Sequence, residues 1–363
     1  MVFRAVIALS IVGSLALLSG CSDDMSIGSD ASFPDGSPDA TPDAGSDAMV
    51  APGPQTLTHR FSPVPIESGE EISGLCQSWD MGNETELFVR SVRSRNDGAW
   101  HHSNWLWAPQ SMFAGEGDTW RCRDRGWDEV VAGFAGDVFF AQSTQAIEEA
   151  QVFAPGTAIR IPPNSSVVGG VHLLNATPNA MNTAIEFEVD TVPESEVDTV
   201  LVGTSFTITN LAIPPRTESR FSMTCDIGEV YQRTYGKLPD FKIYYVLPHY
   251  HTLGTFFRLD LVGGSRDGDV IFEQESLIGE PLGETLAVPV DVTGSEQLRF
   301  TCGYDNPRNE TVRFGIGDQE MCVFLAFTDA PARWVADSTS VEYVADVDGI
   351  PHYEAECRLL TVF

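Results

Sequence analysis

Residues 255–276, TFFRLDLVGGSRDGDVIFEQES, contain two apolar runs separated by a short segment of glycine, aspartate, serine and arginine. Phe, Val and Ile favour strands, whereas Gly and Asp favour turns. The stretch therefore predicts a β-hairpin that turns between Gly263 and Asp269.

The same pattern of short β-prone runs and turn residues recurs along the chain. Examples are residues 85–94 (TELFVRSVRS), 200–213 (VLVGTSFTITNLAI) and 242–248 (KIYYVLP). Helical periodicity is scarce, and only residues 144–152 (TQAIEEAQV) suggest a short helix or turn. Many short strands at this spacing predict an all-β sandwich or jelly-roll fold.

The length of the chain favours two such units. A single hydrophobic core rarely grows to this size, so we expect two tandem antiparallel jelly rolls. We place them at residues 55–194 and 195–363. The boundary lies in the acidic segment 189–200, which contains Pro193.

The N-terminus has the pattern of an export signal. Arg4 precedes an apolar run, residues 5–18, that is too short for a membrane span. The sequence Leu-Ser-Gly-Cys at residues 18–21 resembles the lipobox of bacterial lipoproteins, which implies removal of residues 1–20 and lipidation of Cys21. The alternative is an ordinary secreted protein with a chance cysteine. Ser22, where an aspartate would favour the inner membrane, points to the outer membrane.

Residues 22–54 are expected to form a disordered tether. They are rich in Ser, Asp, Pro, Ala and Gly, with seven aspartates and no Lys or Arg. Such a composition has too little to bury to offset chain entropy.

The charge balance is strongly acidic. The chain has 52 Asp plus Glu against 21 Lys plus Arg, a net charge of −31. Repulsion from phosphates argues against nucleic acid and against anionic membrane surfaces as partners. Membrane contact is therefore expected only through the lipid anchor.

Five of the seven histidines fall in three short motifs. Strand alternation places His249 and His251 of LPHYHTLG on one face, where both can reach one ion. His101 and His102 of GAWHHSNWLW would point to opposite faces, so they share an ion only where the strand ends or bends. His172 in VVGGVHLLNA is alone. Each motif by itself also fits a structural histidine.

Six cysteines remain after Cys21, and an even number in an exported protein indicates disulfides. Six cysteines allow fifteen pairings, which the spacing does not distinguish. They are Cys76, Cys122, Cys225, Cys302, Cys322 and Cys357.

Together these motifs resemble the copper type II, ascorbate-dependent monooxygenases, the family of peptidylglycine α-hydroxylating monooxygenase and dopamine β-monooxygenase. The order is His-His, a later strand histidine, His-x-His followed by Leu253-Gly254, and then Glu-Met-Cys at residues 320–322. IPPRTESRFSMTCDI (213–227) and FTCGYDN (300–306) also follow the family's order. The resemblance runs from about Cys76 to Cys322 and implies two jelly rolls.

The resemblance implies two copper ions. One ion would be held by His101, His102 and His172, and the other by His249, His251 and Met321, where dioxygen reacts. A thioether favours Cu(I) and imidazole suits both copper states, so this set fits copper that cycles. Ascorbate or another one-electron reductant would supply electrons for hydroxylation of a small-molecule C–H bond. The implied disulfides are Cys76–Cys122, Cys225–Cys357 and Cys302–Cys322.

The chain departs from the family at substrate-binding positions. The arginine, asparagine and tyrosine that bind a peptide carboxylate are replaced by Leu247, Val323 and Leu325, and a glutamine is replaced by Gly170. A buried carboxylate would have no partner here, which argues against a peptidylglycine substrate.

Two other functions remain open from the sequence. One is a non-enzymatic copper-binding lipoprotein for sequestration or delivery, favoured by the loss of substrate-binding side chains. The other is a metal-free adhesion or glycan-binding module, in which the Trp-rich stretch at residues 100–107 forms a sugar platform.

Overall fold

The structure, a computed structural model, describes residues 53–127, 135–142, 145–275, 282–315 and 318–362. The predicted signal segment, Cys21 and nearly all of the predicted tether lie outside these residues. Among the described residues, no helix has the length and apolar character needed to cross a membrane.

The first half of the folded chain contains twelve described strands. They are β1 (Gln55–Arg60), β2 (Val64–Ile66), β3 (Glu71–Asp80), β4 (Leu87–Asn96), β5 (Trp100–Pro109), β6 (Thr119–Arg121), β7 (Asp137–Gln142), β8 (Glu148–Val152), β9 (Thr157–Ile161), β10 (Ser165–Leu174), β11 (Met181–Thr183) and β12 (Ile185–Val192).

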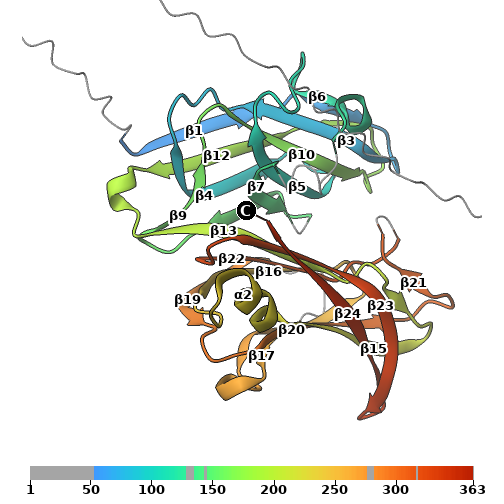
Figure 1. Ribbon diagram of the computed structural model, residues 1–363. Coiled ribbons are helices and arrows are strands. Elements are labelled where there is room, and N and C mark those ends of the chain that lie inside the picture. Colours follow the sequence, from blue (N-terminus) through green and yellow to red (C-terminus); the bar gives the residue numbers. More distant parts are fainter. Residues whose placement is uncertain (1–52, 128–134, 143–144, 276–281, 316–317, 363) are drawn as a thin grey trace, which may run out of the picture. The chain divides into compact units, whose positions relative to one another are not determined.

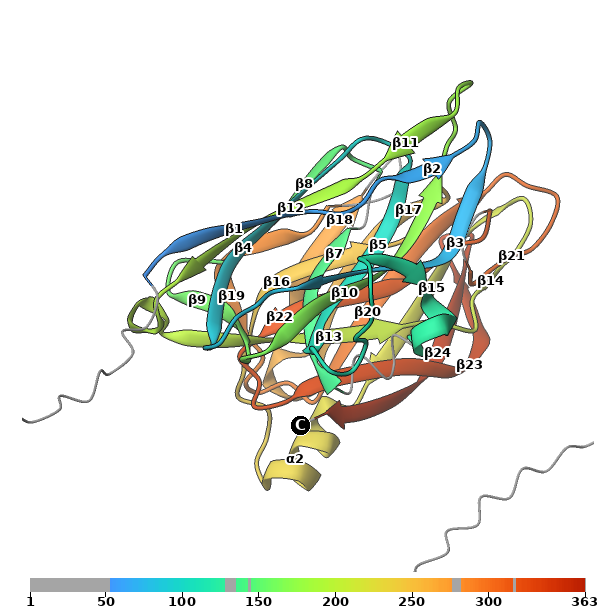
Figure 2. The same cartoon turned by 90° about the horizontal axis from the view of Figure 1, so that it is seen from above.

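The second half contributes twelve more described strands. They are β13 (Thr199–Thr207), β14 (Ala212–Ile213), β15 (Thr217–Cys225), β16 (Lys242–His249), β17 (Gly254–Val262), β18 (Val270–Glu275), β19 (Glu284–Asp291), β20 (Gln297–Asn306), β21 (Val312–Arg313), β22 (Val323–Thr328), β23 (Arg333–Val347) and β24 (Ile350–Val362). The described helices are α2 (Ile227–Tyr235), which lies at the edge of the strands in Figure 2, and the 3₁₀ turns η1 (Cys122–Arg125), η2 (Glu194–Glu196) and η3 (Gly264–Arg266).

The strands of the first half form a sandwich. One sheet has the order β6-β3-β10-β5-β7, and β1, β12, β4 and β9 line up in the other. Side chains from both sheets meet in a shared core, which we call the first core. Within it the Trp105 and Phe187 rings pack edge to face with centroids 4.8 Å apart.

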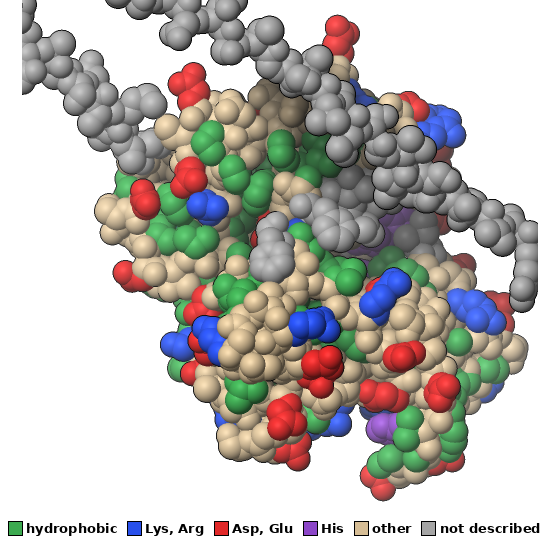
Figure 3. All heavy atoms as spheres, viewed as in Figure 1, with side chains coloured by type: hydrophobic (Ala, Val, Ile, Leu, Met, Phe, Trp, Pro, Cys, Tyr) green, Lys and Arg blue, Asp and Glu red, His purple; other side chains and the backbone are tan. Residues whose placement is uncertain are grey.

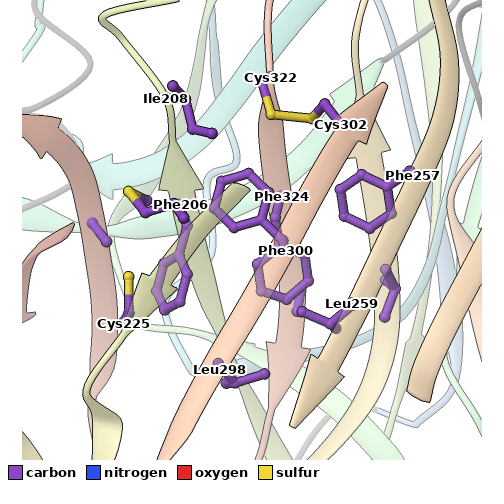
Figure 4. Packing of buried hydrophobic residues seen from close by; sticks show 14 of the residues in the cluster. Phe206, Ile208, Cys225, Phe257, Leu259, Leu298, Phe300, Cys302, Cys322 and Phe324 are labelled. Carbon is purple, nitrogen blue, oxygen red and sulfur yellow. A yellow bond between two sulfur atoms is a disulfide. The ribbon is translucent and has the colours of Figure 1, made fainter. Parts of the chain in front are cut away.

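A second core fills the other half. Phe206, Phe257, Phe300 and Phe324 come from four different strands and meet at its centre (Figure 4). The Phe324 ring lies 5.6 Å from Phe206 and 6.1 Å from Phe300, measured between centroids. These contacts bring together strands that are far apart in sequence.

Strand β22 belongs to both cores. It pairs antiparallel with β13 on one side and β16 on the other. Phe324 and Ala326 point into the second core, whereas Leu325 and Phe327 point into the first core. Figure 1 shows β13, β22 and β16 running between the strands of the two halves. Burial on both faces explains why VFLAFT is a continuous apolar run rather than an alternating one.

The all-β fold and the hairpin predicted at residues 255–276 are confirmed. Strands β17 and β18 pair antiparallel, with Phe257 opposite Gln274 and Leu259 opposite Phe272, and η3 forms the turn. The first core also contains Tyr244, Tyr245, Leu247, Leu325 and Phe327 of the second half. One continuous sheet joins the two halves, because β13 also pairs in parallel with β9.

Residues 144–152 were predicted as a short helix or turn, and this is wrong for their described part. Residues 148–152 form strand β8, which pairs with β4. Glu149 and Gln151 are buried, while their neighbours are exposed. Pairing with a neighbouring strand overrides the helical preference of Glu, Ala and Gln.

The predicted linker is shorter than expected. Residues 189–192 complete β12 and residues 199–200 begin β13, so only residues 193–198 connect the halves.

Helix α2 is not predicted from the sequence. Its signal was present, because the Asp226 carboxylate accepts the Glu229 backbone N–H at 2.6 Å, as an N-cap does.

The Trp-rich stretch belongs to the core. Trp100 and Trp105 expose 1% and 0% of their surface. Their rings lie 6.5 Å apart within the first core. Buried rings present no face to a sugar, so the platform interpretation fails for these two residues.

Replacing Phe327 by alanine tests the role of β22. The Phe327 ring packs on Phe153 at 4.9 Å, and Phe327→Ala is expected to lower the free energy of unfolding in urea by about 3–5 kcal/mol. Val288→Ala is the control, because Val288 is 76% exposed and its truncation should change stability by less than about 0.5 kcal/mol. Equal effects of the two changes would contradict a shared core at β22.

Candidate metal centre

A bulge in strand β5 allows two adjacent histidines to face one site. Opposite β10, His102 pairs with His172 but Trp100 pairs with Leu173, so His101 is an extra residue on β5. A bulge turns an additional side chain toward the same face. His101 and His102 are both buried, and the bulge is a local bend of the kind that sharing an ion would require of adjacent residues.

His172 is held between two partners. Its Nδ1 lies 3.0 Å from Nε2 of His102, the residue directly opposite on β5. Its Nε2 lies 2.6 Å from the carboxylate of Glu71, on the neighbouring strand β3. Nothing in the sequence around Glu71 signals this role.

The His-x-His pair lies where β16 ends. His249 pairs with Val323 of β22, and His251 follows in the connection to β17. Among the described strands, β19 pairs with β16 only as far as Val246, and Pro248 lies beyond that point. Proline has no backbone N–H, so its position here removes no hydrogen bond between β16 and β19.

All five motif histidines form one group, which we call the histidine cluster. The closest neighbours have ring centroids 4.8–5.6 Å apart, and these pairs link residues of both halves. His101, His102 and His251 each offer a ring nitrogen within 4.8 Å of the other two. Histidine atoms are visible in a recess on the face drawn in Figure 3.

The segment before Met321 positions the His-x-His turn. The buried Glu320 carboxylate accepts the backbone N–H groups of His251 at 2.8 Å and Leu253 at 2.7 Å. The Gln319 carbonyl lies 2.8 Å from His251 Nδ1 and accepts its proton. This leaves Nε2 as the nitrogen with a lone pair. Buried Nε2 has no hydrogen-bond partner among the described residues.

Met321 follows these two residues directly. Its carbonyl accepts a hydrogen bond from the Tyr304 hydroxyl at 2.5 Å, and its side chain is partly buried. Cys322 is bonded to Cys302 on β20, which ties the methionine's segment to the second core.

The three disulfides expected from the family resemblance are confirmed. They are Cys76–Cys122, Cys225–Cys357 and Cys302–Cys322.

The glycine after His-x-His-Thr-Leu is needed for a close approach. Tyr250 is fully buried, and a Cβ added to Gly254 would lie 1.9 Å from its ring. A side chain at this position would push Tyr250 away, and with it the two flanking histidines.

The environment favours the neutral imidazole at three histidines of the cluster, His101, His102 and His251. Burial, together with the neighbouring His172 and His251, lowers the pKa of His101 to about 4. Burial also holds the pKa of His102 well below its usual value and lowers that of His251. Neutral imidazole is the form that binds metal ions. Burial raises the pKa of Glu320 to about 7, although the hydrogen bonds from the backbone N–H groups of Leu253 and His251 act to lower it.

Two of the four positions that depart from the resembled family, Leu247 and Leu325, are part of the packing between halves. Leu247 and Leu325 expose 3% and 7% and lie in the first core. Val323 is partly buried, and Gly170 pairs with Cys76 and Asn104 within the β10 ladders. Leu247 and Leu325 therefore fill a core rather than line an open substrate site.

The donor set fits copper. Imidazole binds both common copper oxidation states, and the one lone-pair nitrogen of His251 is buried without a partner among the described residues. Met321, which follows Glu320 in the sequence, is the one soft thioether in the Glu-Met-Cys motif. The residues present are therefore compatible with a copper ion at the cluster.

Comparison with known proteins identifies no family. No family model and no curated protein matches the chain. Solved structures that match include the major capsid protein P2 of bacteriophage PM2, at 8% identity over 76% of this chain and 97% of that chain, with a TM-score of 0.35. PNGase F, a glycosylasparaginase from Flavobacterium meningosepticum, matches at 8% identity over 77% and 97%, with a TM-score of 0.32. At these scores neither similarity bears on function.

Replacing Glu320 by glutamine tests the support of the His-x-His turn. The two carboxylate oxygens of Glu320 each accept one backbone N–H, from His251 and from Leu253. A glutamine amide has only one acceptor oxygen, so the turn that carries His251 would lose one of these hydrogen bonds. We expect Glu320→Gln to weaken copper binding about 10–100-fold in a chelator competition, the usual effect of losing an outer partner. Exposed Glu342→Gln is the control. Unchanged affinity in Glu320→Gln would show that the carboxylate does not position the site.

Proposed function

We propose that this protein is a copper-dependent monooxygenase that hydroxylates a C–H bond of a small-molecule substrate, using dioxygen and a reductant such as ascorbate. The observation that carries the proposal is the assembly of five histidines, from three distant motifs, into one cluster in which four are buried and His249 is partly buried. In this proposal the protein acts at the cell envelope, attached through lipidated Cys21.

The ligands that would hold copper are drawn from the histidine cluster, together with Met321. When bound, copper supplies the one-electron steps that activate dioxygen. The chain contributes neutral imidazoles at His101 and His102 and, through the Gln319 carbonyl, the tautomer of His251. The low exposure of His101, His102 and His251, at 5%, 9% and 2%, limits access of water.

The substrate is proposed to be other than a peptidylglycine. Leu247 and Leu325 are buried in the first core and offer no hydrogen bond to a carboxylate. A carboxylate buried beside them would lose its hydration without compensation. Substrate selection therefore has to come from other parts of the recess.

The burial of these leucines also favours a second candidate function. A lipid-anchored copper-binding protein, for sequestration or delivery, would need the ligands but no substrate site. Redox behaviour separates the two: a storage protein should hold Cu(I) in the presence of oxygen, whereas a monooxygenase should consume oxygen.

Met321→Ala is the variant that tests the proposed chemistry. Purified protein loaded with copper is expected to take up oxygen when ascorbate and a panel of C–H substrates are added. Met321→Ala should keep copper on the histidines but lose most of this uptake, because the soft ligand that favours Cu(I) is gone. Met223→Ala, in the second core, is a methionine control for nonspecific damage.

A wild-type protein that binds copper yet shows no uptake with any substrate would contradict the monooxygenase and favour sequestration. Equal oxygen uptake by wild type and Met321→Ala would contradict the role of the methionine.

A further inference from the structure

We propose that His101, His102 and His251 are the histidine ligands of one copper ion held between the two halves, with His172 and Glu71 as their orienting partners. This rests on the proposed function in one respect only, the binding of copper at the histidine cluster. It replaces the two separate ligand sets that the family resemblance implies with one that combines members of both.

Distances within the cluster do not separate two sets. The His102 ring lies 5.3 Å from His101 in its own half, and 5.4 and 5.6 Å from His249 and His251 in the other half. Spacing within a motif is therefore the same as spacing between motifs. Two well-separated copper sites would require the spacing between motifs to be larger than the spacing within a motif.

The three proposed ligands are close enough to bind one ion. Their ring nitrogens lie within 4.8 Å of one another. At metal–nitrogen bonds of about 2.0–2.1 Å, two ligands of one ion lie at most about 4 Å apart. Small ring rotations would close the remaining distance.

Both ring nitrogens of His172 already have a hydrogen-bond partner. His172 is therefore better suited to orient a copper ligand than to bind the ion itself. The Glu71 carboxylate only accepts, so His172 Nε2 donates to it and His172 Nδ1 carries the lone pair. That lone pair accepts the proton of His102 Nε2. The lone pair of His102 is then on Nδ1. The hydrogen bonds from Glu71 through His172 therefore orient His102 as a carboxylate orients a metal-bound histidine.

The opposite half fixes its ligand in the same manner. The Gln319 carbonyl accepts the Nδ1 proton of His251 and leaves Nε2 for the ion. The lone-pair nitrogens of His102 and His251 are thus selected by two partners from different halves, Glu71 through His172 and Gln319. Each half would supply both a ligand and the group that orients it.

A double-mutant copper count tests the shared set. We would prepare His101→Ala, His251→Ala and the double variant, load them with Cu(I) under anaerobic conditions, and count copper retained after a chelator wash. With one shared ion, each single variant loses the same ion, and the double variant loses no more than either single variant. His352→Ala, a histidine outside the cluster, should retain all copper.

Two results would overturn the shared set while leaving the proposed function intact. One is additive loss, in which each single variant loses one ion and the double variant loses two. The other is a His251→Ala variant that keeps all its copper. Wild-type protein that retains no copper would overturn both the shared set and the proposed function.

A measurement on the wild type avoids any question of misfolded variants. One equivalent of Cu(I) bound by both halves should slow amide hydrogen exchange in peptides covering residues 98–104 and 249–254 together. Protection of only one of these peptides by the first equivalent would overturn the shared set.

Discussion

Burial of strand β22 on both faces is the constraint on which the rest of the structure depends. Phe324 and Ala326 pack into the second core, and Leu325 and Phe327 pack into the first. A strand with two apolar faces has only one place in the fold, between two cores. Because β16 pairs with β22, this packing also places the end of β16, with His249, against the first half.

The histidine cluster follows from that arrangement and from local devices. The β5 bulge turns His101 and His102 to the same site, and β10 places His172 directly opposite His102. On the other side, the Glu320 carboxylate and the Gln319 carbonyl hold the turn that carries His251. The Cys302–Cys322 bridge anchors this segment to the second core. Rigid supports of this kind keep ligand positions defined before any ion binds.

The same packing accounts for the apolar residues at Leu247 and Leu325. Both contribute to the first core, so a polar group there would be buried against hydrocarbon. Positions 247 and 325 can either pack in the core between the halves or form hydrogen bonds to a substrate, but not both. The identity of the substrate is therefore a question about the recess rather than about these two side chains.

The sequence by itself determined the all-β class, the hairpin at residues 255–276 and the histidine motifs, because these follow from local residue preferences and spacing. The disulfide pairing came from the family resemblance, since cysteine spacing is compatible with many pairings. Only the tertiary structure decided that residues 148–152 form a strand, that His101 bulges from β5, and that Glu71 reaches His172. It alone brought the histidines of both halves into one cluster, because that depends on two cores sharing one strand, a contact between residues far apart in the chain.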